Sequence, residues 1–238
     1  MRLGPAPPQA PWGPVAVVFL AGAYEDVDYY AAWAARADLV VAADGAAAFL
    51  VAQGIRPDVV IGDLDSLPAA TLERLVGDGV EVVRHPVRKS ETDGELAVAE
   101  ARRRGAGEVL LAGALGALDH TLGHLTILRR LAAAGVAARL VSPRLTVRVL
   151  VAPAESYLDA PPSTRVSLVA LGGDARVTLE GLEYPLARQA LPCDTCLGLG
   201  NAVALAPSRV VVHEGTVAVL VASGEEAFGG LPTGPAAS

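Results

Sequence analysis

The sequence predicts an α/β chain in two parts, a parallel sheet with helices on both faces and then an antiparallel β-sandwich. Up to residue 142, short runs of Val, Ala, Leu and Ile alternate with helical stretches, which is typical of a parallel sheet covered by helices. From Pro143 onward, Pro, Gly and Asp turns separate the apolar runs and no clear helix lies among them, as in an antiparallel sandwich or barrel. We therefore expect a Rossmann-like domain over 1–142 and a β-sandwich domain over 143–238.

Each expected element of the first domain has a local reason. Strands are expected where an apolar run ends at a turn residue, at 15–20, 38–43, 59–61, 80–84, 109–112 and 136–141. Helices are expected between them, at 28–37, 46–53, 68–76, 92–104 and from Asp119 or Thr121 to 134. Gly54, Gly77 and Gly135 stand just past three of these helices, where glycine is favoured. Thr92 and Glu95 have the spacing of a capping box, which predicts a helix start.

The second domain is predicted from its strand-like runs alone. These runs lie at 146–151, 165–171, 175–179, 202–206, 209–213 and 216–222. The tail from Gly224 is rich in Gly, Pro and Ala, and we expect it to be poorly ordered.

The composition indicates a globular chain with an aliphatic core. Hydrophobic residues make up 52% of the chain, charged residues 19% and aromatic residues 4%, so disorder of the whole chain is not expected. A net charge of −7 without a basic block argues against nucleic acid as a partner. No apolar run reaches the roughly 18 residues of a membrane span, and the Pro-rich start is no secretory signal. We expect a cytoplasmic protein that does not bind a membrane.

Cys193 and Cys196 form the chain's single C-x-x-C motif. A structural zinc site needs a second pair of ligands, and a thioredoxin-like site needs a strand–helix pattern that this stretch lacks. Two incidental thiols on a loop are the simplest interpretation, and a local disulfide is the alternative.

Two carboxylates directly follow one buried strand of the first domain. The apolar run 59–61 ends at Gly62, and Asp63 and Asp65 come next. Two ionised carboxylates about 4 Å apart in a half-buried site repel each other by roughly 4 kcal/mol, so they either point apart or share a cation. Oxygen ligands suit Mg²⁺ bound to substrate phosphates. The alternative is a surface turn in which Asp65 or Ser66 caps the next helix.

Other carboxylates are expected at the same edge, because the loops that follow parallel strands share one edge of the sheet. The acidic residues of these loops are Asp44, Asp63, Asp65, Asp93 and Asp119. A Mg²⁺-bound phosphate chain is their natural ligand. Arg88 and Lys89 are candidate cations, or else a solvated surface pair, and the helix N-termini behind Thr92 and Asp119 offer N–H groups to phosphate. His120 is interpreted as a structural histidine. The chain has no P-loop and no dinucleotide-binding glycine motif.

A series of short motifs follows this pattern along the chain. The motifs are Ala43-Asp44-Gly45, Gly54-Ile55-Arg56-Pro57-Asp58, Ile61-Gly62-Asp63-Leu64-Asp65-Ser66, Lys89-x-x-Thr92-Asp93, Gly113-Ala114-Leu115-Gly116 with Leu118-Asp119-His120, Gly181-Leu182-Glu183-Tyr184-Pro185-Leu186 and Gly198-x-Gly200-Asn201. In this order and at this spacing, they resemble the thiamine pyrophosphokinase family over nearly the whole chain.

The resemblance implies an enzyme that transfers pyrophosphate from ATP to thiamine, giving thiamine diphosphate and AMP. It implies a homodimer with the active site at the subunit interface and the thiamine partly held by the partner's second domain. Mg²⁺ would be bound by Asp63, Asp65 and Asp93, and either Asp65 or Asp93 would accept the hydroxyl proton. By position, Asp44 and Asp119 would help to organise the metal–phosphate site, Lys89 would contact phosphate and Asn201 would lie near the thiamine. Arg88, Thr92 and Gly116, which lie in or beside these motifs in the sequence, are further candidates for binding ATP.

The chain departs from the family's usual motifs at several positions. Ser90 replaces an Asp, the loop before Asp119 is one residue shorter and lacks an Arg, His124 stands where an Asn is common, and Gly200 replaces a Ser. The missing Arg matters most, because a guanidinium is well suited to clamping phosphate. These departures leave open a weakened paralogue that only binds nucleotide or thiamine, or a pyrophosphokinase for another alcohol. Asp63-x-Asp65 also resembles the haloacid dehalogenase motif, although Leu67 stands where that motif has Thr or Val.

Overall fold

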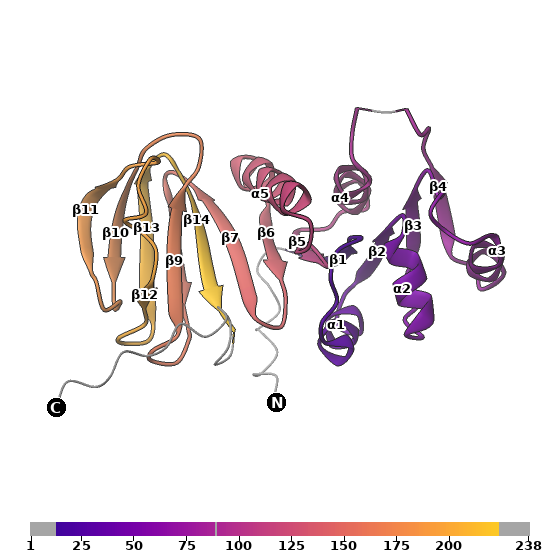
Figure 1. Cartoon of the computed structure of the whole chain (residues 1–238), viewed down its shortest axis with the longest axis horizontal. Helices are drawn as coiled ribbons and strands as arrows, with labels where there is room; N and C mark the ends of the chain where they lie inside the picture. The colour runs from indigo at the N-terminus through magenta and orange to yellow at the C-terminus, as the bar shows by residue number, and fades with distance from the viewer. Residues whose placement is uncertain (1–12, 89, 224–238) are drawn as a thin grey trace. The chain divides into compact units, whose positions relative to one another are not determined.

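The computed structural model describes residues 13–88 and 90–223. The chain forms two compact units, Met1–Ser142 and Pro143–Ser238 (Figure 1). The expected fold class is confirmed, with a parallel sheet and helices in the first unit and antiparallel strands in the second. Lys89 and the tail from Gly224 lie outside the described residues.

The first unit is built on parallel strands in the spatial order β6-β5-β1-β2-β3-β4. The strands are β1 (Val15–Phe19), β2 (Leu39–Ala43), β3 (Val59–Gly62), β4 (Glu81–Arg84), β5 (Glu108–Ala112) and β6 (Ala137–Val141). In register, Val17 of β1 pairs with Val40 of β2 on one side and with Leu110 of β5 on the other. All three side chains are buried, as expected for the centre of a sheet covered on both faces.

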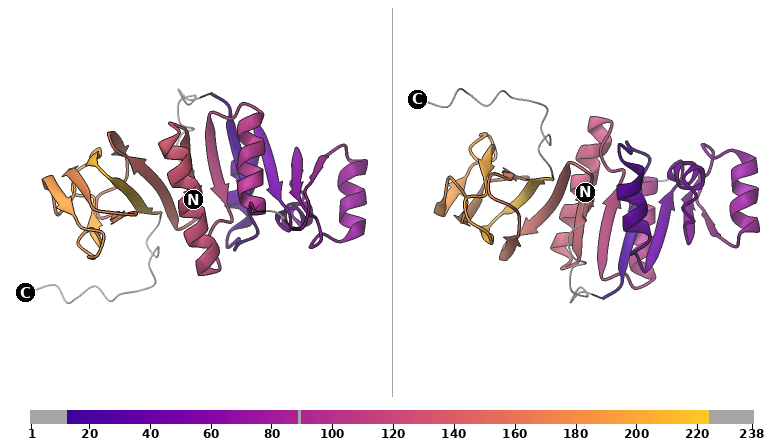
Figure 2. Two further views of the ribbon diagram at one scale, coloured as in Figure 1. Left: turned by 90° about the horizontal axis from the view of Figure 1, so that it is seen from above. Right: turned by 90° about the horizontal axis from the view of Figure 1, so that it is seen from below.

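Helices cover both faces of this sheet. They are α1 (Val27–Ala34), α2 (Ala46–Ala52), α3 (Ala69–Gly77), α4 (Asp93–Arg103) and α5 (Leu118–Ala133). Tyr30, Leu50 and Leu75, from α1, α2 and α3, share one core cluster with Val17 and Phe19 of β1. The two views of Figure 2 place α4 and α5 on the opposite face.

The helix starts agree with the sequence in part. Thr92 caps α4, and Thr92 and Glu95 form both hydrogen bonds of the capping box. The alternative in which Asp65 or Ser66 caps the next helix is wrong, because α3 has Pro68 at its N-cap and no side-chain cap. The helix expected from Asp119 or Thr121 begins at Leu118, also without a side-chain cap.

The strand order creates a crevice at one place in this sheet. From β1 the chain adds β2, β3 and β4 on one side, then crosses over through α4 and adds β5 and β6 on the other side. The loops that follow β1 and β5 therefore lead to helices on opposite faces. Such a switch point at the carboxyl ends of parallel strands is where ligands bind in open α/β sheets.

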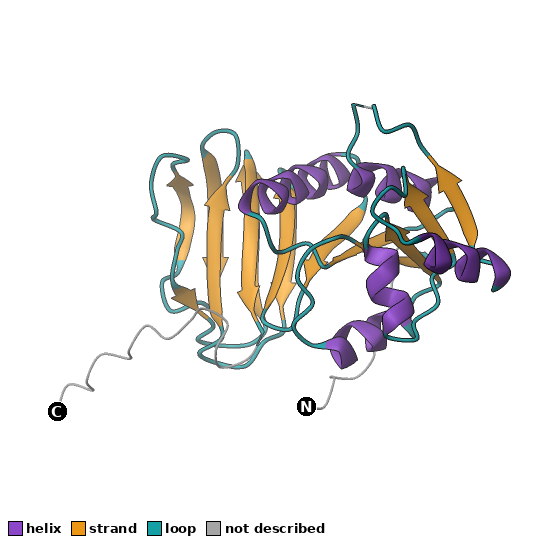
Figure 3. Ribbon diagram, turned by 45° about the vertical axis from the view of Figure 1, so that its right-hand side comes forward, coloured by secondary structure: helices purple, strands orange, loops and turns teal. Residues whose placement is uncertain are grey.

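The second unit consists of antiparallel strands in two sheets (Figure 3). Within this unit one sheet has the order β12-β9-β14-β7 and the other β11-β10-β13-β8. The strands are β7 (Leu145–Val151), β8 (Ala154–Leu158), β9 (Arg165–Ala170), β10 (Ala175–Glu180), β11 (Leu186–Leu191), β12 (Asn201–Ala202), β13 (Ser208–Glu214) and β14 (Thr216–Ala222). Val166 and Val219 of the first sheet share a core with Val177 and Val212 of the second, which makes this unit a sandwich.

Two strands of the second unit were not expected, and one is shorter than expected. β8 contains Glu155 and Tyr157, which are exposed, and β11 carries exposed polar residues at one edge of its sheet. Neither segment shows an apolar run. The strand expected over 202–206 is only Asn201–Ala202 in the structure. Over the described residues, no helix is long and apolar enough to cross a membrane.

Candidate active site

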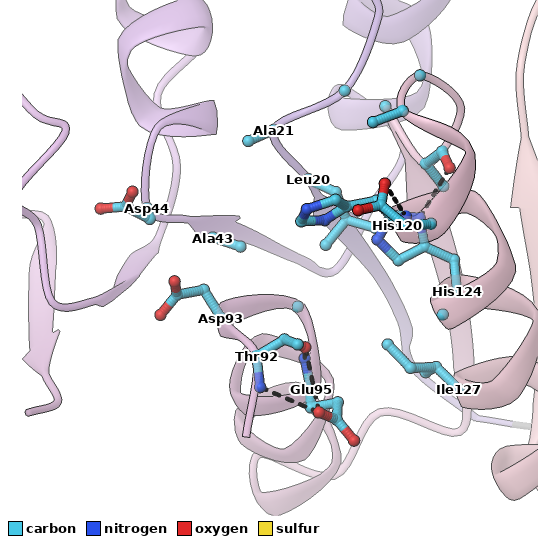
Figure 4. A pocket seen from close by; sticks show the side chains of 18 of the residues that line it. Leu20, Ala21, Ala43, Asp44, Thr92, Asp93, Glu95, His120, His124 and Ile127 are labelled. Carbon is cyan, nitrogen blue, oxygen red and sulfur yellow. Dashed lines mark hydrogen bonds between the residues drawn. The ribbon is translucent and has the colours of Figure 1, made fainter. Parts of the chain in front are cut away.

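A cavity of about 840 Å³ lies in the first unit at the carboxyl ends of the strands. Its walls come from the loops that follow β1, β2, β3, β4 and β5, from the first turn of α4 and from the first ten residues of α5. The loops after β1 and β5 are those of the switch point, so the cavity occupies the crevice that the strand order creates. Figure 4 shows Asp44 and Asp93 at one end of the cavity and His120 and His124 at the other, where the Asp119 carboxylate accepts from the His120 N–H.

Asp44, directly after β2, is held in an unusual conformation by its surroundings. Its φ is +40°, which non-glycine residues seldom adopt, and its N–H donates to the carbonyl of Ile61 at 2.8 Å. The Ser66 hydroxyl donates to one carboxylate oxygen, Oδ2. The other, Oδ1, is buried and has no hydrogen-bond partner in the part of the chain that the structure describes. Because a buried unpaired carboxylate oxygen is costly, this atom fits a bound cation.

Asp63 and Asp65 complete a cluster with Asp44. One carboxylate oxygen from each of the three residues lies within 4.8 Å of the other two. Asp44 and Asp63 are half-buried, whereas Asp65 is exposed. The charge of Asp63 and its hydrogen bond raise the pKa of Asp65 above its ordinary value, and Asp44 and Asp93 add to this effect. The three carboxylates thus repel one another and offer the all-oxygen ligand set that Mg²⁺ prefers.

Asp93 lies beside this cluster, in the first turn of α4. Its Oδ1 is 3.1 Å from the point that a Cβ on Gly62 would occupy, and the Asp44 Cβ is 2.9 Å from the same point. Gly62 therefore lets the loops after β2 and β3 approach the N-terminus of α4. Glu95 fixes this turn, because its carboxylate accepts from the Thr92 N–H at 3.0 Å and from Arg130 of α5 at 3.0 Å. Those contacts lower the pKa of Glu95.

The loop after β5 and the start of α5 form the other wall. Gly116 and Asp119 line the cavity, and the Asp119 carboxylate accepts from the N–H of His120 at 2.8 Å. The backbones of the loops after β1 and β5 touch, since a Cβ on Gly22 would lie 2.1 Å from the Gly113 carbonyl oxygen. His124, one turn beyond His120, also lines the cavity. From the sequence, His124 was expected only as a departure from the family's motif, although its i,i+4 spacing from His120 places both on one helix face.

The structure does not bring every expected residue to this cavity. Arg88 is exposed and does not line it, although Val87 and Glu91 of the same loop do. Lys89 is outside the described residues. Asn201 belongs to the second unit, where its buried side chain accepts from the Tyr184 N–H at 3.0 Å and donates to the Tyr184 carbonyl at 2.9 Å. These contacts give Asn201 a structural role, and its expected contact with a ligand stays a prediction.

The fold and the site define this chain as an α/β protein with an acidic cavity at the switch point of its parallel sheet, joined to an antiparallel β-sandwich. Residues 30–140 match the family model described as "Thiamin pyrophosphokinase, catalytic domain". This stretch belongs to that family, and the resemblance read from the motifs is confirmed. A search of curated proteins found no match.

Solved structures show the same fold over nearly the whole chain. Thiamine pyrophosphokinase from Bacillus subtilis is 19% identical with a TM-score of 0.77, covering 89% of this chain and 100% of its own. A thiamin pyrophosphokinase family protein from Enterococcus faecalis is 21% identical with a TM-score of 0.75, covering 90% and 100%. The yeast enzyme is 14% identical with a TM-score of 0.72, covering 87% and 85%.

Proposed function

We propose that this protein is a thiamine pyrophosphokinase, which transfers a pyrophosphoryl group from ATP to the hydroxyethyl oxygen of thiamine. The observation that carries the proposal is the cluster of Asp44, Asp63 and Asp65, in which one Asp44 oxygen is buried and has no partner among the described residues. Asp44 and Asp63 line the cavity at the switch point of the sheet, and Asp65 lies beside them. A cavity of about 840 Å³ falls in the size range of ligand pockets, roughly 300–1,000 Å³.

Mg²⁺ would be held by Asp44, Asp63 and Asp65, with Asp93 beside them. The fit rests on the unpartnered Asp44 oxygen and on the mutual repulsion that raises the pKa of Asp65. When bound, the ion would neutralise the charge of the phosphate chain. The family resemblance implied Asp93 as a ligand and left Asp44 outside the ligand set. The closest carboxylates in the structure instead favour Asp44 as a ligand.

The residues of this chain would act by positioning and by moving one proton, because phosphoryl transfer asks little covalent chemistry of a protein. The thiamine hydroxyl oxygen bonds to the β-phosphorus of ATP, the bond from that phosphorus to the α–β bridging oxygen breaks, and AMP leaves. The hydroxyl proton passes to Asp65 or Asp93. Thr92 and Glu95 hold the first turn of α4, whose backbone N–H groups would face phosphate. Gly116 would let the loop after β5 approach the phosphate from the opposite wall.

The remaining parts of the proposal concern the second unit and the assembly. We propose a cytoplasmic homodimer in which the second unit helps to hold thiamine. Asn201 would contribute through Tyr184, whose backbone it fixes and whose side chain is exposed. Lys89 and Arg88 would contact phosphate from the loop before α4.

The direct test is the purified protein with Mg²⁺, ATP and thiamine. We expect thiamine diphosphate and AMP in equal amounts. Formation of ADP, or of no product, contradicts the proposal. Tight ATP binding without product would instead identify a binding paralogue, turnover with another alcohol would identify a different acceptor, and release of phosphate from a monoester would favour a phosphatase.

A second test measures the metal site without turnover. Added Mg²⁺ should raise the thermal stability of the wild type, because a ligand that binds only the folded state stabilises it. Asp63→Asn should lose most of this stabilisation. Asp78→Asn is the matched control, because Asp78 is an exposed carboxylate that follows α3 and lies outside the cavity. An equal response to Mg²⁺ in both variants would rule out a metal site at the cluster.

A further inference from the structure

The two ends of the cavity differ in chemistry. Asp44 and Asp93 point into one end, and His120 and His124 stand at the other (Figure 4). At the histidine end, Leu20 and Ile127 are buried apolar residues that line the wall between α4 and α5, and the Asp119 carboxylate lies beside His120. A charged phosphate chain with its cation suits the acidic end, whereas an uncharged group suits the apolar wall.

The hydrogen bond of His124 fixes the tautomer of its ring. Nδ1 lies 2.7 Å from the carbonyl oxygen of Ala114, and because a carbonyl oxygen only accepts, Nδ1 carries the proton. In the neutral ring, Nε2 is then an acceptor. Burial lowers the pKa of His124, and the nearby His120 adds to this, although the bond to Ala114 opposes it. Burial and the nearby His120 thus favour the neutral ring of His124 at pH 7.

The acceptor atom Nε2 faces the slot between α4 and α5. It is 3.9 Å from the point that a Cβ on Gly94 would occupy, and Ile127 Cδ1 is equally far from that point. Leu20 Cδ2 lies 3.0 Å from the same point, so Gly94, which has no Cβ, lets Leu20, Ile127 and Nε2 approach the first turn of α4 closely. Among the described residues, Nε2 has no hydrogen-bond partner. A half-buried acceptor without a partner, on an apolar wall, is suited to a neutral donor from a ligand.

We propose that His124 contacts the substrate and that its Nε2 accepts a hydrogen bond from an N–H or O–H of the nucleoside part of ATP. The nucleoside therefore lies between α4 and α5 and the phosphates lie at the carboxylates. A phosphate oxygen cannot take this place, because its lone pairs would face the lone pair of Nε2. This assignment rests on the proposed function. It makes His124 a residue that selects nucleotides whose nucleoside can donate a hydrogen bond to Nε2.

The donor can be the amino group of the base or a ribose hydroxyl, and the ligands of the test separate the two. Calorimetry with Mg²⁺ and without thiamine would compare ATP with purine riboside triphosphate, which lacks the amino group, and with 2′-deoxy-ATP and 3′-deoxy-ATP. Because a neutral hydrogen bond contributes about 0.5–1.5 kcal/mol, we expect one of the three analogues to bind the wild type about three- to tenfold more weakly than ATP does.

The same measurements on variants test whether His124 is the acceptor. His124→Leu should weaken ATP binding by a similar factor and should no longer distinguish ATP from that analogue, whereas His124→Gln, which keeps an acceptor oxygen, should retain part of the difference. His213→Leu is the matched control, because His213 belongs to the second unit and is bonded to Thr178; it should behave as the wild type. Persistent discrimination in His124→Leu, or its loss in His213→Leu, overturns the assignment.

An NMR measurement on the wild type avoids variants that fail to fold. The imidazole nitrogens of His124 should show a protonated Nδ1 and a bare Nε2 in the free protein. The Nε2 signal should shift with Mg²⁺ and ATP, but not with Mg²⁺ and inorganic pyrophosphate, which reaches only the acidic end. If ATP binds and Nε2 does not respond, this inference is wrong while the proposed function stands. If ATP does not bind at all, both fall together.

Discussion

Gly62 occupies a position where even one added methyl group should disturb the acidic site. It ends β3 with a φ of +152°, which residues with a Cβ rarely adopt. A Cβ there would lie 2.9 Å from the Cβ of Asp44, 3.3 Å from its Cα and 3.1 Å from Oδ1 of Asp93. The first two atoms cannot rotate away, so Gly62→Ala must push the loop after β2 outward.

The expected cost follows from these contacts. Carbon atoms normally approach no closer than about 3.5 Å, so the overlap with Asp44 is about half an ångström. Overpacking of this kind costs about 1–3 kcal/mol, and the backbone conformation adds about 1–2 kcal/mol for a residue with a Cβ. We expect Gly62→Ala to lower the free energy of unfolding by about 2–5 kcal/mol, and to weaken the stabilisation by Mg²⁺ because Asp44 and Asp93 move.

Urea unfolding with and without Mg²⁺ would measure both effects. The matched control is Gly77→Ala, because a Cβ on Gly77 at the end of α3 would meet no atom within 4 Å. That control should be neutral or up to about 1 kcal/mol more stable, since alanine restricts the unfolded chain. If Gly62→Ala were as stable as Gly77→Ala and responded equally to Mg²⁺, the close approach of the loops after β2 and β3 to α4 would be refuted.

Three other changes have outcomes that the structure predicts. Hydrogen bonds from Arg103 and Arg104 hold the pKa of Glu100 at about 2 in the folded protein. Because the unfolded chain keeps the ordinary pKa, the ionised Glu100 stabilises the fold fully above that ordinary pKa, and this stabilisation is lost as the pH falls through about 2. The stability difference between the wild type and Glu100→Gln in urea should therefore shrink from pH 6 to pH 3. Thr92→Ala removes the cap of α4 and should cost about 1 kcal/mol, measured by thermal unfolding; no loss would contradict the capping box. Asn201→Ala removes buried hydrogen bonds to Tyr184 and should destabilise the second unit by about 2–4 kcal/mol, seen as faster proteolysis there; unchanged proteolysis would favour a role in ligand binding alone.

The elements of the first unit could be predicted from the sequence, because its local turn and capping residues agree with the order of its strands and helices. Each apolar run ends at a turn residue, and the capping box at Thr92 and Glu95 marks the start of α4. The carboxyl ends of parallel strands share one edge, so the sequence alone predicts that acidic residues in successive loops lie together. That reasoning correctly groups Asp44, Asp63 and Asp65.

The sequence was insufficient wherever a partner distant in the chain decides the role of a residue. Ser66 looked like a helix cap, but it donates to Asp44, 22 positions earlier. β8 and β11 have no apolar run of their own and exist because they pair with β13 and β10. His124 lines the cavity because α5 lies against the loop that carries Ala114, and no spacing rule reveals that contact.

The acidic cluster combines two requirements that oppose each other. Three fully buried carboxylates would prevent folding without a metal, because an unpaired buried charge is far too costly. Three fully exposed carboxylates would bind Mg²⁺ weakly, because water screens them. Here Asp44 is half-buried and held by Ser66, whereas Asp65 is exposed and takes much of the repulsion as a raised pKa. The fold can therefore form without an ion, and under the proposed function the repulsion that remains would be released when Mg²⁺ and a phosphate chain bind together.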